Sequence, residues 1–70
     1  MDKNLLANDI KQSVKGSGFI NISQLAKYLR KSRGSAAEIV NGLDYLDMGR
    51  EKKFFIEDVA ARIAGMKKLG

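Results

Sequence analysis

The sequence predicts a mainly α-helical fold with a small β-hairpin, and three observations carry that prediction. Apolar residues recur at three- and four-residue spacing in four separate stretches, which is the period of amphipathic helices. Two strand-like pieces, residues 45–48 and 53–56, flank a polar turn that contains Gly. Hydrophobic residues make up 44% and charged residues 30% of the 70 positions, as in a folded globular protein. The expected order is helix, short strand, helix, helix, hairpin, helix.

The first helix is expected at roughly residues 3–15. Leu6, Ile10 and Val14 lie at positions i, i+4 and i+8, so they form one apolar stripe along it. Residues 16–18, Gly-Ser-Gly, end this helix, because Gly is the favoured residue just past a helix C-terminus.

The domain division follows this break. Residues 1–18 form an N-terminal helix with a Gly-rich connector, and residues 19–70 form the main domain. The main domain opens with residues 19–22, Phe-Ile-Asn-Ile, which are expected to be extended because they include two β-branched residues and an aromatic one.

Two short helices with a four-residue break between them are expected next. Ser23 is a good N-cap for the first of the pair, and residues 31–34, Lys-Ser-Arg-Gly, form the break. Two N-caps compete for the second helix: Ser32 within the break, and Ser35, which fits a capping box with Glu38. The apolar faces of the two helices consist of Leu25, Ala26 and Leu29, and of Ala36, Ile39, Val40 and Leu43.

The hairpin and a last helix complete the domain. Gly42 marks the end of the third helix, and residues 49–52, Gly-Arg-Glu-Lys, form a turn between the two strand-like pieces. Glu57 or Asp58 then opens the last helix, where an acidic residue suits the positive end of the helix dipole.

Two helices joined by a four-residue break and followed by a hairpin describe a winged helix-turn-helix. The pattern is carried by Leu25-Ala26, Leu29, Ser32-Arg33, a Gly-containing hairpin with basic residues, and Phe54-Phe55-Ile56 followed by Asp58-Val59. Over roughly residues 19–64 it resembles the excisionase-type, MerR-like winged helix-turn-helix domains of bacterial mobile elements. That family often has Gly and an aliphatic residue where this chain has Arg30 and Lys31, and the helix at 3–15 is additional to its pattern. The resemblance implies DNA binding, with the third helix in the major groove and the hairpin wing on the backbone or minor groove.

The composition excludes several classes of site. The chain has no Cys and no His, so disulfides, Cys/His zinc sites, a Cys nucleophile and a His general base are all excluded. We therefore expect no enzyme, no cofactor and no metal. Asn8 and Asp9 interrupt the apolar stretch that a signal peptide requires, and no apolar run is long enough to span a membrane, so a cytoplasmic location is expected. The net charge of +5 suits a nucleic-acid partner.

Six basic residues are candidate phosphate contacts, and they fall in two clusters. One surrounds the break between the helices and the other lies on the hairpin. If all six touched DNA phosphates, the logarithm of the binding constant would fall with the logarithm of salt concentration with a slope of about −5. The alternative is that these side chains are only solvated surface. The clusters are Arg30, Lys31 and Arg33, and Arg50, Lys52 and Lys53.

The third helix carries the candidate base contacts. With Ala36 facing inward, helical geometry places Gly34, Ala37, Glu38 and Asn41 on the outer side and Ser35 on its flank. Glu38 can accept from cytosine or serve only as a capping partner, and Asn41 can pair with adenine or only end the helix. The predicted DNA-binding residues of the turn and third helix are Arg30, Lys31, Ser32, Arg33, Ser35, Ala37, Glu38 and Asn41.

The leading hypothesis is a DNA-binding protein without catalysis, acting as an excisionase-like recombination directionality factor or a small transcriptional regulator. Its expected partner is double-stranded DNA, with a recombinase or a second copy of itself as further candidates, and with no membrane or small-molecule ligand. The main alternative is a helical protein-interaction domain, in which the basic clusters are incidental. An RNA-binding domain is a third possibility, which the charge alone does not exclude.

Overall fold

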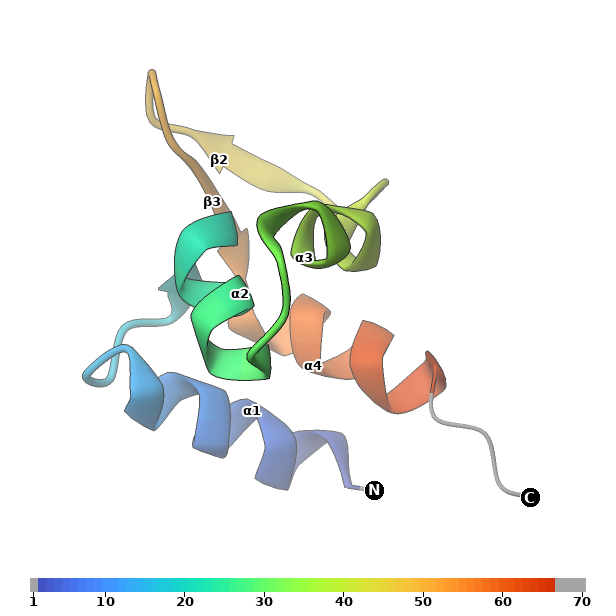
Figure 1. Cartoon of the computed structure of the whole chain (residues 1–70). Helices are drawn as coiled ribbons and strands as arrows, with labels where there is room; N and C mark the ends of the chain where they lie inside the picture. The colour runs from blue at the N-terminus through green and yellow to red at the C-terminus, as the bar shows by residue number, and fades with distance from the viewer. Residues whose placement is uncertain (1, 67–70) are drawn as a thin grey trace.

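The computed structural model describes residues 2–66 of the chain, so the last four residues of the expected domain, 67–70, lie outside the described part. Within it, four helices and a three-stranded sheet confirm the predicted mainly α fold with a small hairpin (Figure 1). None of the helices in residues 2–66 has the length and apolar character needed to cross a bilayer. The elements are α1 (Lys3–Ser13), β1 (Phe19–Ile20), α2 (Ile22–Leu29), α3 (Arg33–Val40), β2 (Tyr45–Asp47), β3 (Lys52–Phe55) and α4 (Ile56–Met66).

The sheet has the order β1-β3-β2, and both pairs of strands are antiparallel. In β3, Phe54 faces the helices and is buried, with Ile20 of β1 on one side and Tyr45 of β2 on the other. Because successive residues of a strand face opposite ways, Phe55 lies on the outer face of the sheet. There its ring lies 5.0 Å from the ring of Phe19, centroid to centroid.

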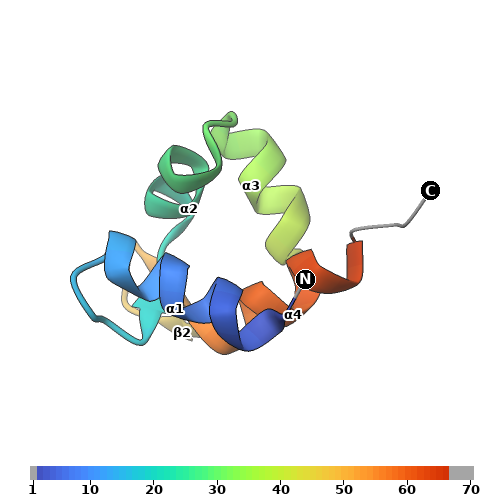
Figure 2. The ribbon, with the colours of Figure 1, turned by 90° about the horizontal axis from the view of Figure 1, so that it is seen from below.

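A single hydrophobic core joins α1 to the rest of the chain. Leu6 and Ile10 of α1 are buried in the same cluster as Leu25 of α2 and Val59 of α4. Figures 1 and 2 show α1 lying alongside α4, and Figure 2 shows both helices on the side opposite the turn between α2 and α3. The N-terminal helix is therefore packed on the main domain.

Two helices begin at a different residue from the one the sequence predicts. The prediction of Ser23 as the N-cap of α2 is wrong: Asn21 is the N-cap, and α2 includes Ile22, which was expected to be extended. Asn caps a helix as well as Ser, and Gln24 completes a capping box with it. The last helix begins at Ile56, directly after β3, rather than at either acidic residue that follows.

The turn between α2 and α3 closes tightly on the end of α2. Arg30 has a left-handed backbone with φ of 57°, and the Lys31 amide donates to the Ala26 carbonyl at 3.0 Å. This hydrogen-bond pattern ends helices that finish in a left-handed residue, a position where Gly is usual. Ser32 then caps α3, which decides between the two candidate caps: its hydroxyl accepts from the Ser35 amide at 3.1 Å.

A hydrogen bond from the Tyr28 hydroxyl to the Asp9 carboxylate ties α2 to α1. Burial, then this hydrogen bond and the charge of Asp9, raise the pKa of Tyr28 from its ordinary value of 10.0 to about 12. Because the folded-state pKa exceeds the unfolded one, the neutral phenol stabilises the fold below about pH 10. That contribution is lost as the pH rises from about 10 to about 12.

We therefore expect the wild-type chain to lose more stability than Tyr28→Phe over the same pH interval. Urea unfolding at several pH values between about 10 and about 12 measures this difference, because the two proteins differ only in the Tyr28 hydroxyl. Tyr45→Phe, on the half-exposed tyrosine of β2, is the control and should behave like the wild type. Parallel pH profiles for all three proteins would contradict the proposed tie between α1 and α2.

Candidate nucleic-acid interface

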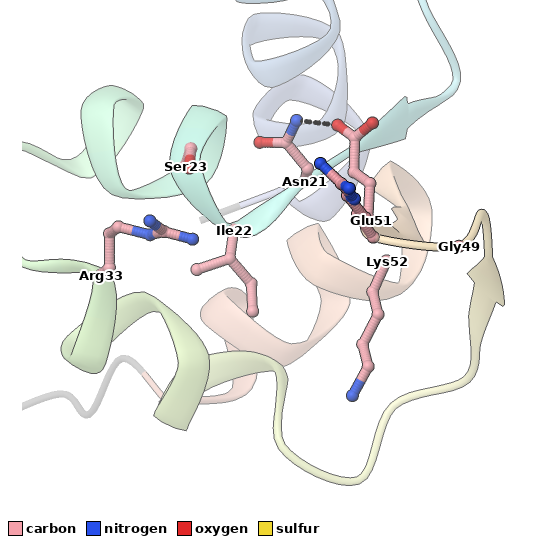
Figure 3. A pocket seen from close by; sticks show the side chains of 8 residues that line it. Asn21, Ile22, Ser23, Arg33, Gly49, Glu51 and Lys52 are labelled. Atoms are coloured by element: carbon pink, nitrogen blue, oxygen red, sulfur yellow. Dashed lines mark hydrogen bonds between the residues drawn. The ribbon is translucent and has the colours of Figure 1, made fainter.

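A hollow of about 380 Å³ lies between the start of α2, the start of α3 and the hairpin (Figure 3). We call residues 45–55 the wing and this space the wing hollow. Arg33 reaches it from the first residue of α3, whereas Arg50 and Lys52 reach it from the wing. All three side chains are exposed, so the fold brings cations from both predicted clusters to one place on the surface. The hollow is lined by Asn21, Ile22, Ser23, Arg33, Gly49, Arg50, Glu51 and Lys52.

The other three predicted cations do not line the hollow. Arg30 and Lys31 are exposed on the turn between α2 and α3. Lys53 is half-buried and precedes the inward-facing Phe54, so it lies on the outer face of the sheet. Its ammonium group is 3.6 Å from a carboxylate oxygen of Glu51. The predicted clusters are therefore divided by the fold, and three of their six members line one hollow.

The tip of the wing has a two-residue loop that presents Arg50. The amide of Met48 donates to the Glu51 carbonyl at 2.8 Å, which leaves Gly49 and Arg50 at the tip. Gly49 has φ of 81°, which is a conformation that favours Gly, and its amide donates to the Asp47 carboxylate at 3.1 Å. The wing therefore ends in a short, hydrogen-bonded turn with a cationic side chain at its end.

The aromatic side of the wing holds Lys52 close to the helices. Its ammonium group lies 4.9 Å from the centroid of the Tyr45 ring, within the range of a cation–π interaction. Tyr45 in turn packs on the buried Phe54, with ring centroids 5.7 Å apart. Lys52 thus lies on the face of β3 that is turned toward the core and α3, and aromatic packing supports it there.

The outer surface of α3 differs from its predicted composition at one position. Gly34, Ser35, Glu38 and Asn41 are exposed, in agreement with their predicted placement. Ala37 is half-buried instead, because it faces the wing. Since Ser32 caps α3, Glu38 is not the partner of a capping box at Ser35. The exposed carboxylate of Glu38 therefore does not serve as a capping partner, which was the alternative to a base contact.

Ala37 lies beside a second hollow, of about 200 Å³, between α3 and the wing. Ile22 and Lys52 line this space as well as the wing hollow, so the two hollows adjoin. Together they run beside α3, from Arg33 at its first residue to Asn41 at its C-terminal cap.

Arg62 of α4 supports the C-terminal end of α3, a role that the sequence analysis missed. Its guanidinium group donates to the carbonyl oxygens of Ile39 at 3.1 Å and Asn41 at 3.0 Å. These carbonyls lie at the negative end of the helix dipole, and α3 has no basic residue of its own in its last turn. The partners are more than 20 positions apart, so local spacing carries no signal for this contact.

Asn21 and Glu51 are the other residues that the sequence analysis missed. The Asn21 side-chain amide donates a hydrogen bond to the Glu51 carboxylate across 30 positions of the sequence (Figure 3). The Glu51 carboxylate contacts both this amide and the Lys53 ammonium group. Asn-x-x-Gln at residues 21–24 is a sequence signal for the cap, whereas nothing local indicates the partner on the wing.

The chain matches no known protein family, no curated protein and no solved structure. The case for a functional site therefore rests on the arrangement of its own residues. The strongest part of that arrangement is the set of three basic residues, from two separate elements, that line one hollow.

Proposed function

We propose that this protein binds double-stranded DNA through α3 and the wing, and that it catalyses no reaction. One observation carries the proposal: Arg33 from α3 and Arg50 and Lys52 from the wing line the same hollow. Cations held on two elements around a concave surface suit a phosphate backbone, which supplies most of the affinity in protein–DNA binding. Arginine also offers paired N–H donors that match phosphate oxygens.

The start of α2 adds to the positive potential of the hollow. Ile22 and Ser23, the first two residues of this helix, lie on its wall. A helix N-terminus carries a partial positive charge, and this one faces the same space as the three cations. The proposed phosphate therefore lies where a helix dipole and formal charges act in the same direction.

The exposed face of α3 supplies the base contacts of the proposal. Glu38 can accept from the amino group of cytosine, and Asn41 can pair with adenine in the major groove. Gly34 and Ser35 are small, so they allow the helix to approach the base edges closely. Because this face offers few strong readers of sequence, the affinity is dominated by phosphate contacts and falls steeply with salt.

The proposed role is that of an excisionase-like recombination directionality factor or a small transcriptional regulator in the cytoplasm. Both roles need a compact DNA-binding module, and the first also needs a protein contact, with a recombinase or a second copy of the chain. The apolar side chains that the wing exposes favour such a contact: Leu46 is 41% and Met48 60% exposed. A domain that binds only a protein partner through this face is the second candidate function.

Titration of the labelled protein with a mixed-sequence DNA duplex, followed by NMR, tests the proposal. We expect amide shifts on residues 30–41 and 49–52, and we expect these shifts to weaken sharply as salt is raised from about 50 to about 200 mM. The control is a double-stranded RNA of the same length, whose deep, narrow major groove does not admit α3. The absence of shifts at low salt, or equal shifts with the RNA, would contradict the proposal.

A further inference from the structure

We infer that Asn21 and Glu51 form a latch that holds the tip of the wing against the start of α2. The latch keeps Arg50 and Lys52 at a fixed position relative to Arg33. The latch is the hydrogen bond from the Asn21 side-chain amide to the Glu51 carboxylate. Its effect on DNA rests on the proposed function, whereas its effect on the wing does not. Asn21 and Glu51 are thus positioning residues that act through the three cations of the wing hollow.

The orientation of the Asn21 amide is set by the helix that it caps. Its side-chain oxygen accepts from the Gln24 backbone amide at 2.7 Å, and the Gln24 side chain accepts from the Asn21 backbone amide at 3.0 Å. With the oxygen committed to the cap, the amide nitrogen of the same group is directed away from α2 and toward the wing. One side chain therefore both starts α2 and contacts the hairpin.

Glu51 is held equally firmly on the other side of the latch. Its backbone carbonyl closes the tip by accepting from the Met48 amide at 2.8 Å. Its carboxylate contacts the Asn21 amide and lies 3.6 Å from the Lys53 ammonium group. A contact that restrains this carboxylate therefore also restrains the turn that Glu51 closes, including Arg50.

The outer part of the wing has little else to hold it. β1 pairs with β3 only at Phe54 and Phe55, so residues 46–53 extend beyond the three-stranded part as a two-stranded hairpin. Such a hairpin is marginally stable by itself in water. Among residues 2–66, the latch is the one side-chain hydrogen bond between this outer hairpin and a helix or its cap. Without it, no side-chain hydrogen bond restrains the tip of the wing, which carries Arg50, relative to the helices.

The latch also keeps a negative charge from opposing the ligand. Glu51 lies on the wall of the wing hollow, where a free carboxylate would repel a phosphate. In the latched state its Oε1 oxygen contacts both the Asn21 amide and the Lys53 ammonium group, which offset its negative charge. Opening the latch therefore weakens phosphate binding in two ways, by loosening the cations and by releasing the carboxylate.

An exchange of donor and acceptor tests the latch. Asn21→Asp keeps a good N-cap but places a second carboxylate against Glu51. Glu51→Gln, added to it, supplies an amide that donates to the new carboxylate, and the double variant has the wild-type net charge. Asn21→Ser is the matched control for capping, because Ser caps α2 without donating across to the wing or adding charge.

In the free protein, the readouts are the heteronuclear NOE of residues 48–52 and the urea midpoint. Asn21→Asp and Asn21→Ser should lower the NOE of the tip, and the double variant should restore it, while the urea midpoints show that each protein is folded. An unchanged tip in Asn21→Asp would overturn the latch, as would a double variant no more ordered than that single one.

With DNA, we expect Asn21→Asp to weaken binding by about 3- to 10-fold, and we expect the double variant to recover most of that loss. Full recovery of tip order without any recovery of affinity would show that the latch does not position the cations, which overturns the inference. If the wild-type protein does not bind DNA, the proposed function fails, and the NOE measurement still decides whether the latch exists.

Discussion

Replacement of Ile10 with Ala is expected to lower the free energy of unfolding by about 2–5 kcal/mol. Ile10 has no exposed surface and lies in the core that α1 shares with α2, the sheet and α4. The truncation removes buried apolar contacts and leaves a cavity that a small core fills poorly. A domain of 70 residues has a total stability of about 4–10 kcal/mol, so this one substitution should bring the protein close to unfolding.

Urea unfolding followed by far-UV circular dichroism measures this loss. Leu5→Ala is the matched control in the same helix, because Leu5 is 68% exposed and its truncation should change the stability by less than about 0.5 kcal/mol. Similar midpoints for the two variants would mean that α1 is not docked in solution. A large difference would establish α1 as part of the domain, even though the resemblance treats it as an addition.

The helices and the hairpin could be predicted because each leaves a local pattern in the sequence. The stripe of Leu6 and Ile10 and the buried positions of α2 and α3 repeat at helical spacing, and the periodicity survives in the fold. The starts of the helices were harder to predict, because several residues near each start can cap. Asn21 and Ser23 are both good N-caps two positions apart, and the choice is decided by the partner that Gln24 offers.

What the sequence could not show depends on contacts between distant segments. β1 has only two residues and exists because β3 pairs with it, more than 30 positions later. Arg62 reaches the end of α3, and Glu51 reaches the cap of α2, across separations that no periodicity records. The separation of Lys53 from Lys52 could have been predicted from the sequence, because a buried Phe54 places Lys53 on the opposite face of the strand.

Replacing Arg33, Arg50 and Lys52 together with Gln is expected to weaken DNA binding by about 100-fold or more near 0.1 M salt. Each phosphate contact contributes about 0.9 to the slope of log K against log salt, so the loss of three should reduce the slope by about 2.7. For a protein with six such contacts, the slope would become less steep, changing from about −5 to about −2.5. Fluorescence anisotropy with a labelled duplex at several salt concentrations measures both quantities.

The control must remove the same charge from another place. Lys3, Lys11 and Lys15 are exposed on and just after α1, and their replacement with Gln takes the net charge from +5 to +2, as the first set does. Charge acting at long range would weaken binding and reduce its salt dependence alike in both triple variants, because salt screens long-range attraction. Direct contact at the wing hollow predicts a much larger reduction of the slope in the first triple variant than in the second. Equal slopes would therefore assign the basic clusters to solvated surface and would favour a protein partner for the exposed face of the wing.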